Sequence, residues 1–231
     1  MKKEQETAKK FGNTLNGPSK IEIINVSKRF KNEQVLKNVS LTLNDGRIYG
    51  FVGRNGSGKS VLFKLICGYL FPDEGKIIVN GQTIGKDVDF PESLGALIET
   101  PGFIWYQSGY ANLLYLARIQ NRITKDQVKD AIRKVGLDPD SKKWAGKYSL
   151  GMKQRLGIAQ AIMEEPKILI LDEPMNGLDE SGVEDMRRLL LDYKKPGRII
   201  LLTSHNSEDI HALCDEVFVM KDGAVVQSAK D

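Results

Sequence analysis

The chain has 231 residues, a net charge of +4, 41% hydrophobic residues and 28% charged residues. This length is enough for one domain with a sizeable apolar core, and the composition excludes fibrous, disulfide-built and wholly disordered chains. The small net charge gives little attraction to a polyanion, so we expect no nucleic-acid partner.

Residues 1–20 are polar and lysine-rich, and they end in the turn-forming sequence Asn-Gly-Pro-Ser. We predict a flexible basic tail over residues 1–20 and one domain over residues 21–231. A solvated tail is the simple interpretation, and contact with an anionic membrane or with nucleic acid is the alternative.

Other sequence features indicate a reducing compartment. Cys67 and Cys214 have no paired spacing, which favours free thiols over a disulfide or a zinc site. The N-terminus lacks an apolar signal segment, and no stretch reaches about 18 apolar residues. We therefore expect a cytoplasmic protein whose role at a membrane needs a separate membrane-spanning partner.

Strand and helix patterns alternate along the chain. We predict strands at residues 21–26, 35–43, 47–52, 76–79, 94–98, 167–171 and 198–203, helices at 59–70, 182–193 and 207–214, a helical stretch from 106 to about 162, and a closing hairpin of 217–220 with 224–227. Such alternation predicts an α/β fold with parallel strands, into which the middle helical stretch is inserted.

A glycine-rich loop carries the strongest chemical signal. Residues 53–60 read GRNGSGKS, which matches G-x-x-x-x-G-K-[ST], between a predicted strand and a predicted helix. Glycines let the backbone curl so that several N–H groups and a helix N-terminus converge on a phosphate. Lys59 should reach the β- and γ-phosphates, and the Ser60 hydroxyl should bind Mg²⁺. The alternative is a glycine-rich turn without a ligand.

Two carboxylates follow the apolar strand Ile168–Leu171. Ligands of α/β proteins bind beyond the carboxyl ends of parallel strands. We predict that Asp172 holds Mg²⁺ and that Glu173 accepts a proton from an attacking water. Taken alone, the pair also fits a strand that ends in a solvated turn.

His205 follows the strand RIILLT, which ends at the same edge of the predicted sheet. We predict that it contacts the γ-phosphate, although a lone histidine is more often structural.

With these motifs in place, the chain resembles the ABC ATPases over nearly all of residues 21–227. The segment Tyr148–Arg155, YSLGMKQR, is similar to the family's signature segment, and Asn176–Asp179, NGLD, to its D-loop. The resemblance implies a P-loop core with a mixed sheet, an N-terminal antiparallel β part and an inserted helical subdomain at about 104–163. It also implies ATP and Mg²⁺ as cofactors and a head-to-tail homodimer around two ATP molecules.

The family's functional residues can be carried onto this sequence position by position. The resemblance implies catalytic roles for Lys59, Glu173 and His205 and metal contacts for Ser60, Glu99 and Asp172. It implies nucleotide contacts for Phe30, Gly53, Arg54, Asn55, Gly56, Ser57, Gly58, Lys59, Ser60, Val61, Ser149, Gly151 and Asp179. Phe30 would stack on adenine, whereas Ser149 and Gly151 would bind the ATP held by the partner subunit. A plain helix cap is the alternative for Ser149.

Two segments depart from the family's pattern, at three positions. Leu150 and Met152 replace a glycine and a glutamine of the signature, which we expect to alter the contact in trans. Glu99 replaces the usual glutamine; a carboxylate keeps an oxygen ligand for Mg²⁺ and adds charge. The alternative for Glu99 is a surface carboxylate.

The IETPGF context of Glu99 is similar to the ATPase subunits of bacitracin and lantibiotic self-protection exporters of Gram-positive bacteria. This resemblance implies transmembrane permease subunits as partners and a position on the inner face of the plasma membrane. Two further hypotheses are a soluble ABC protein that acts on ribosomes or DNA and a regulatory subunit that hydrolyses ATP weakly. The single cassette and the short helical insertion disfavour the former, and Leu150 motivates the latter.

Overall fold

The computed structural model describes residues 18–31 and 33–229, so most of the predicted tail lies outside the described residues. Ser19, at the described end of that tail, is buried, and its hydroxyl donates a hydrogen bond to the carbonyl of Gly197 at 2.8 Å. The chain is therefore packed against the domain from residue 19 onward. Within the described residues, no helix combines the length and the apolar character needed to cross a bilayer.

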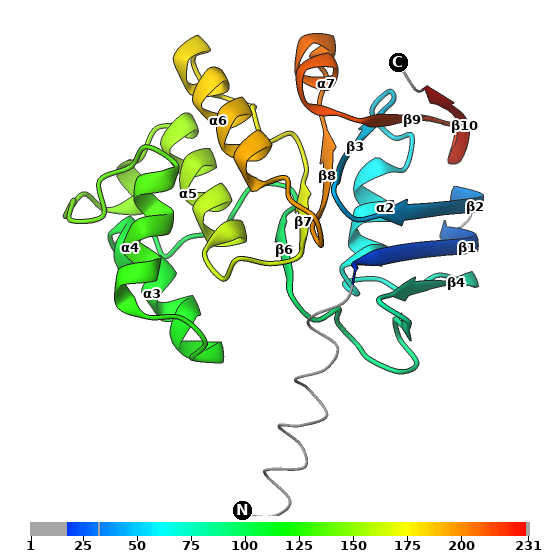
Figure 1. Cartoon of the computed structure of the whole chain (residues 1–231), viewed down its shortest axis with the longest axis horizontal. Coiled ribbons are helices and arrows are strands. Elements are labelled where there is room, and N and C mark those ends of the chain that lie inside the picture. Colours follow the sequence, from blue (N-terminus) through cyan, green and yellow to red (C-terminus); the bar gives the residue numbers. More distant parts are fainter. Residues whose placement is uncertain (1–17, 32, 230–231) are drawn as a thin grey trace, which may run out of the picture.

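A six-stranded sheet forms the centre of the molecule, in the order β10-β9-β3-β8-β7-β6 (Figure 1). Its strands are β3 (Arg47–Val52), β6 (Leu94–Leu97), β7 (Ile168–Leu171), β8 (Ile199–Thr203), β9 (Glu216–Lys221) and β10 (Ala224–Ala229). Five of them run parallel, and β10 pairs antiparallel with β9. Because β3, β7 and β8 are neighbours, the segments that follow them meet at one edge of the sheet.

Both faces of this sheet are buried. Every residue of β7 and β8 is buried, and alternate residues face opposite cores, as a pleated strand requires. Leu169, Leu171 and Leu202 belong to one core with the helices, whereas Ile168, Ile170 and Leu201 belong to the other. The continuous apolar runs in the sequence reflect this double burial.

A second, antiparallel sheet covers one face, in the order β2-β1-β4-β5. Its strands are β1 (Lys20–Phe30), β2 (Glu33–Asn44), β4 (Glu74–Val79) and β5 (Gln82–Thr83). Helix α2 (Lys59–Ile66) contributes Leu62, Phe63, Leu65 and Ile66 to the core on this face. The predicted α/β fold with an N-terminal antiparallel part is thus confirmed.

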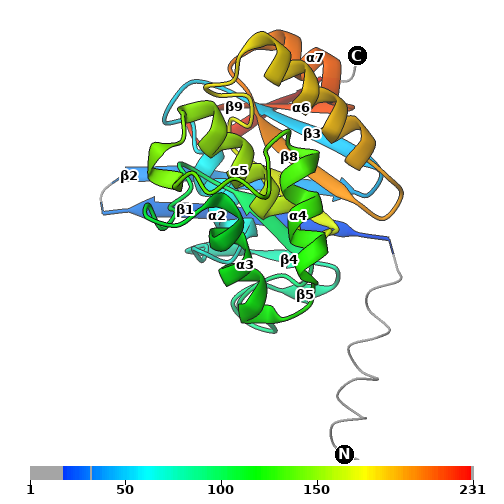
Figure 2. The same ribbon diagram turned by 90° about the vertical axis from the view of Figure 1, so that its left-hand side faces the viewer.

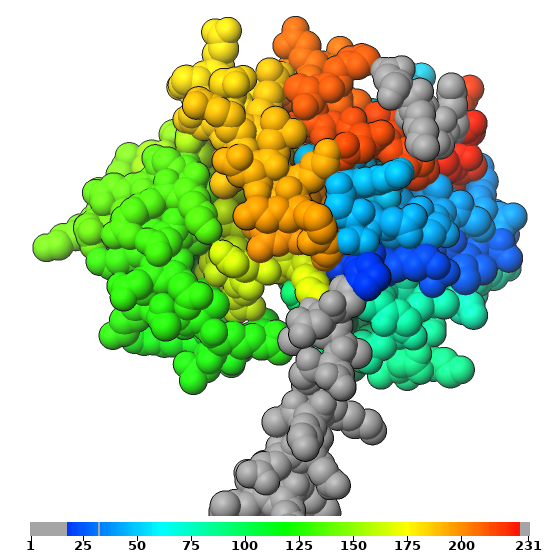
Figure 3. Space-filling view, in the orientation of Figure 1, coloured from blue at the N-terminus to red at the C-terminus, as the bar shows by residue number. Residues whose placement is uncertain are grey.

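Three helices lie between β6 and β7 in the chain and form one end of the molecule (Figures 1 and 2). They are α3 (Gly109–Gln120), α4 (Lys125–Lys134) and α5 (Leu150–Ile162), with a 3-10 turn at Ala145–Lys147 before α5. The space-filling view shows the green residues of α3 and α4 at the end opposite the blue strands (Figure 3). Ser108, Thr124 and Ser149 cap the three N-termini through their side-chain oxygens.

The remaining helices, α6 (Glu180–Tyr193) and α7 (Ser207–Leu213), pack on the same face of the sheet as α5. Their buried residues Met186, Leu190 and Ile210 join the core that also holds Leu156.

Most elements differ by some residues from their predicted bounds; β1, for example, spans Lys20–Phe30 rather than residues 21–26. Two of the differences have a clear local cause. Helix α2 ends at Ile66 rather than near Leu70 because Gly68 turns the chain with a φ of +80°, and a Cβ there would lie 2.2 Å from the carbonyl oxygen of Asp89. The two-residue strand β5 carries too little pattern to be predicted. Cys67 and Cys214 are free, and burial raises the pKa of each thiol to about 12, which keeps both neutral.

Candidate active site

The loop from Gly53 to Gly58 joins β3 to the N-terminus of α2 and fits only glycine at two of its positions. Gly53 has a φ of +155°, and a Cβ on it would lie 2.3 Å from the carbonyl oxygen of Met220. Gly58 has a φ of +101°, and a Cβ on it would lie 2.7 Å from the Leu36 side chain. The glycines therefore let the loop lie against β2 and β9 while its N–H groups remain able to bind an anion.

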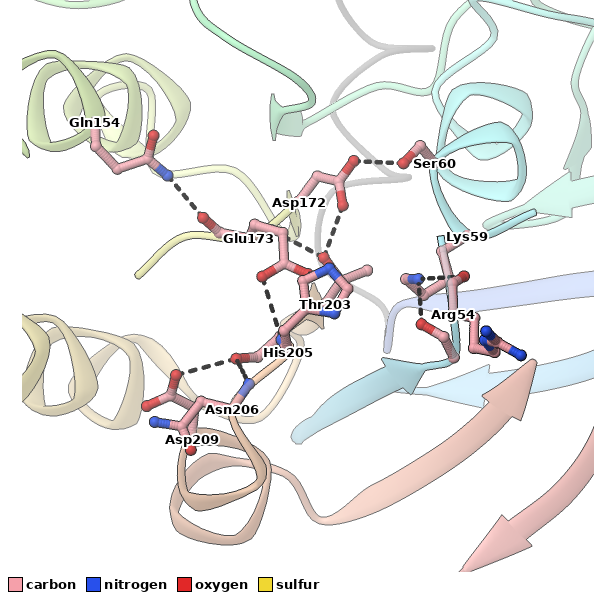
Figure 4. Close-up of polar contacts among 12 residues, drawn as sticks. Arg54, Lys59, Ser60, Gln154, Asp172, Glu173, Thr203, His205, Asn206 and Asp209 are labelled. Atoms are coloured by element: carbon pink, nitrogen blue, oxygen red, sulfur yellow. Dashed lines mark hydrogen bonds and ion pairs between the residues drawn. The ribbon is translucent and has the colours of Figure 1, made fainter. Parts of the chain in front are cut away.

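Lys59 is 8% exposed and points back into this loop (Figure 4). Its Nζ donates to the carbonyl of Gly53 at 2.7 Å and to the carbonyl of Arg54 at 3.2 Å. An ammonium held inside a curled loop is placed to neutralise the charge of a bound phosphate.

Three oxygen-bearing side chains connect α2, β7 and β8. Ser60 Oγ donates to Asp172 Oδ2 at 2.6 Å, and Thr203 Oγ1 donates to Asp172 Oδ1 at 2.7 Å (Figure 4). Both carboxylate oxygens of Asp172 are thus fixed beside the start of α2. Thr203 belongs to the fully buried strand β8, so this geometry has a rigid base.

Glu173 has a left-handed backbone with a φ of +51°, which is rare for a residue with a side chain. Its N–H donates to Thr203 Oγ1 at 2.8 Å, and its carbonyl accepts from Gln154 Nε2 at 2.9 Å. Its Oε2 accepts from the His205 N–H at 3.2 Å, and its Oε1 lies 3.3 Å from His205 Nε2. Contacts from α5 and β8 hold this backbone, whereas the loop after β8 contacts the carboxylate.

These groups surround a cavity of about 250 Å³. It is lined by Val35, Asn55, Gly56, Ser57, Gly58, Lys59, Ser60, Val61, Asp172, Glu173 and His205. The structure therefore brings the phosphate loop, both predicted carboxylates and the predicted histidine to one place.

The residues of this cavity fit a phosphate with a hard cation. Ser57 Oγ and Glu173 Oε1 are buried without a hydrogen-bond partner in the described structure, so they are available to a ligand. Ser60 and Asp172 supply the hydroxyl and carboxylate oxygens that suit Mg²⁺. Among the described residues, no group of three or more His, Cys, Asp or Glu could hold a metal alone. A site built from few protein ligands suits Mg²⁺, which usually keeps waters and shares its coordination with substrate phosphates.

Comparison with known proteins identifies the family. The sequence profile of the ABC transporter family matches residues 36–176, which include the phosphate loop and the two carboxylates. The chain belongs to the ABC transporter family. It is an ATP-binding subunit of a transporter, and it is an ATPase.

Two relatives of this ABC ATPase carry specific names. It is 39% identical to the "Bacitracin transport ATP-binding protein BcrA" of Enterococcus faecalis, over 90% of this chain and 68% of that protein. It is 32% identical to the "Lantibiotic transport ATP-binding protein SrtF" of Streptococcus pyogenes, over 89% of each chain. The predicted resemblance to bacitracin-type and lantibiotic-type ATPases is confirmed.

Solved structures confirm the fold of the ABC ATPase. The dimeric structure of a post-hydrolysis state of the ATP-binding cassette MJ0796, bound to ADP and Pi, superposes with a TM-score of 0.82. That match covers 91% of this chain and 98% of the other at 21% identity.

Seven predicted site residues do not line the cavity of the ABC ATPase. Two of them, Gly53 and Arg54, lie in the phosphate loop, and their carbonyls accept hydrogen bonds from Lys59 Nζ. Ser149 and Asp179 cap α5 and α6, accepting from the N–H groups of Met152 and Gly182. Gly151 lies in the first turn of α5, and Phe30 is 41% exposed at the end of β1. Glu99 forms an ion pair with Lys64 of α2 at 2.5 Å. Their contacts with nucleotide or metal stay predictions.

Three contributors to the site were not predicted. Val35 lines the cavity from β2, Thr203 binds the Asp172 carboxylate and the Glu173 N–H, and Gln154 holds the backbone of Glu173. Thr203 is the polar residue that ends the apolar run RIILLT, and this position at a strand end was a sequence signal for a role in the site. Val35 and Gln154 carry no such local signal, because only the fold brings them to the cavity and to Glu173.

Proposed function

We propose that the chain hydrolyses ATP to drive a permease that exports an antimicrobial peptide of the bacitracin or lantibiotic type. The observation that carries this proposal is the identity to BcrA and SrtF over about nine tenths of the chain. Such a subunit works at the inner face of the plasma membrane, bound to its permease. The names of these relatives favour a transport role over action on ribosomes or DNA.

The phosphate loop binds the triphosphate. Lys59 leaves the carbonyls of Gly53 and Arg54 to meet the β- and γ-phosphate oxygens. Ser60 and Asp172 hold Mg²⁺, which neutralises charge on the β- and γ-phosphates when it is bound. Glu99 would supply a further oxygen ligand, for which its carboxylate would have to separate from Lys64.

Glu173 is the general base. Its Oε1 is buried and has no hydrogen-bond partner among the described residues, so it can accept the proton of a water that attacks the γ-phosphate. His205 lies beside this oxygen and contacts the γ-phosphate. The Oε2 atom accepts from the His205 N–H, which leaves Oε1 for the water.

Two copies of the chain close around two ATP molecules. The N-terminus of α5, with Ser149 and Gly151, presents free N–H groups to the ATP of the partner subunit. Asp179 lies at the start of α6, next in space to α5, and faces the same interface. Phe30 stacks on the adenine from β1.

A cluster of exposed aromatic residues is our candidate contact with the permease. Trp105 and Trp144 are 64% and 47% exposed, and their ring centroids lie 6.1 Å apart. Tyr106 packs edge-on against Trp105, and Lys147 lies over the Trp144 ring. Exposed aromatic residues are enriched at protein interfaces, and this cluster follows the Glu99 segment through which we expect nucleotide binding to be signalled.

The change Glu173→Gln tests the hydrolytic mechanism. It removes the base but keeps the size of the side chain, so we expect turnover to fall at least about 100-fold while ATP still binds. An ATP-bound dimer should then accumulate, which gel filtration with Mg-ATP measures. Lys59→Ala is the matched control, because it should abolish both turnover and the dimer. Near-normal phosphate release by the Glu173→Gln variant would refute the base role.

A further inference from the structure

Helix α5 contacts the catalytic loop Glu173–Asp179 at two points, and the first is Gln154. Its side chain is 9% exposed in the second turn of α5, and its Nε2 donates to the Glu173 carbonyl at 2.9 Å (Figure 4). The same carbonyl accepts from the Asn176 N–H at 3.1 Å. Gln154 thus reaches across from a different element to a carbonyl within the catalytic loop.

The second contact lies at the first residue of α5. A Cβ on Gly177 would lie 2.6 Å from the Leu150 side chain, and a Cβ on Gly151 would lie 2.8 Å from the Gly177 carbonyl oxygen. The helix and the loop therefore approach each other as closely as their glycines permit. Leu150, one of the two residues that depart from the family's signature, supplies the side chain of this contact.

The backbone of Glu173 depends on such contacts. A non-glycine residue with a φ of +51° costs about 1–3 kcal/mol and persists only where its surroundings hold it. The Thr203 hydroxyl accepts from its N–H, whereas Gln154 and Asn176 donate to its carbonyl. Of these three partners, only Gln154 comes from the helix that begins at the signature segment.

We infer that Gln154 is a positioning residue that aims the Glu173 carboxylate by fixing its main chain. This inference rests on the proposed base role of Glu173. Because α5 begins at Leu150, directly after its cap Ser149, any displacement of that helix end by nucleotide is transmitted four residues along the helix, through Gln154, to the Glu173 carbonyl. Each copy of the chain thereby couples the state of its signature segment to the base in its own site.

The change Gln154→Met tests this inference, since methionine has nearly the same length and no donor. We expect kcat for ATP to fall about tenfold, while the KM for ATP and the calorimetric Kd for ATP stay within about twofold. The matched control is Gln160→Met in the last turns of α5, which lies away from the catalytic loop and should leave kcat unchanged. An unchanged kcat in the Gln154→Met variant would overturn the inference.

A double-mutant cycle with Glu173→Gln separates this inference from the proposed function. If Gln154 acts through Glu173, adding Gln154→Met to Glu173→Gln should lower the residual rate less than twofold. A further tenfold loss would show that Gln154 acts independently of Glu173, and the inference would fall. High turnover in the single Glu173→Gln variant would refute the base role itself.

A second variant keeps the test decisive if Gln154→Met does not fold. Gln154→Glu places a carboxylate against the Glu173 carbonyl, and only its protonated form can donate a hydrogen bond. Its kcat relative to the native chain should therefore rise as the pH falls from about 8 to about 6, since burial raises the pKa of the new carboxyl group. A ratio that does not vary with pH would contradict positioning through this hydrogen bond.

Discussion

Leu150 occupies a position where the family usually has glycine, and its surroundings explain how the larger residue fits. Its side chain lies against Gly177, whose φ of +74° and missing Cβ leave the necessary space. The side chain is 60% exposed, so it does not fill the core. The larger side chain at position 150 is therefore accommodated by Gly177, which lies 27 positions later in the same chain.

The change Gly177→Ala tests this pairing at the residue scale. The new Cβ would lie 2.6 Å from Leu150 in a left-handed backbone, so we expect the free energy of unfolding to fall by about 1–3 kcal/mol. Adding Leu150→Ala should recover part of that loss by removing the clash but not the backbone strain. Urea denaturation measures both, and equal stability of the single and double variants would contradict the pairing.

At the scale of elements, ion pairs of Arg187 with Asp209 and Glu208 join α6 to α7. Arg187 Nε and Nη2 donate to Asp209 Oδ1 at 2.9 and 2.6 Å, and Asp209 is 2% exposed. This hydrogen bond raises the pKa of Arg187 and keeps it charged. Ser204 Oγ donates to Asp209 Oδ2 and accepts from the Asn206 N–H, so the pair also fixes the residues on both sides of His205.

The change Arg187→Met should leave Asp209 buried without its cation. We expect the free energy of unfolding to fall by about 3–5 kcal/mol, which thermal or urea unfolding measures. Arg188→Met is the matched control, because Arg188 pairs with Asp185 on the exposed surface of the same helix and should change stability by less than about 1 kcal/mol. Equal effects of the two substitutions on the free energy of unfolding would show that the Arg187–Asp209 pair does not stabilise the contact between α6 and α7.

The distances along the chain explain what the sequence could predict of this site. Gly53–Ser60 and Asp172-Glu173 were found because each is a short motif beside a recognisable strand. Gln154 was missed, and the partner of Thr203 could not be assigned, because their contacts span 19 and 31 positions. Such contacts depend on how α5 and β8 pack, which local patterns do not encode.

At the scale of the whole molecule, one apolar core lies on each face of the central sheet, and the core that holds Leu171 and Leu202 also holds residues of α3, α4 and α5. The alternation of strands and helices predicted the α/β class. The order of the strands, with β3 between β8 and β9, was not predictable, because it is set by pairing between distant segments. The aromatic cluster of Trp105, Tyr106 and Trp144 also arises only in the fold, since its two tryptophans come from segments before α3 and before α5.

Paired changes at this cluster test the proposed permease contact. Trp105→Ala with Trp144→Ala removes the two largest exposed rings of the cluster, so we expect the affinity for the permease in detergent to fall at least about tenfold. Leu191→Ala is the control, because Leu191 is also exposed and apolar but lies on α6. If the double variant binds the permease as tightly as the native chain does, the contact lies elsewhere on the surface.

The same cluster gives the protein a built-in optical reporter. The sequence contains two tryptophans, and both lie in this one exposed patch. Intrinsic ultraviolet emission excited at the red edge of the protein absorption band therefore reports on this patch alone. Covering the two indoles should shift their emission to shorter wavelength, so association at the helical end can be followed in solution without attaching a dye.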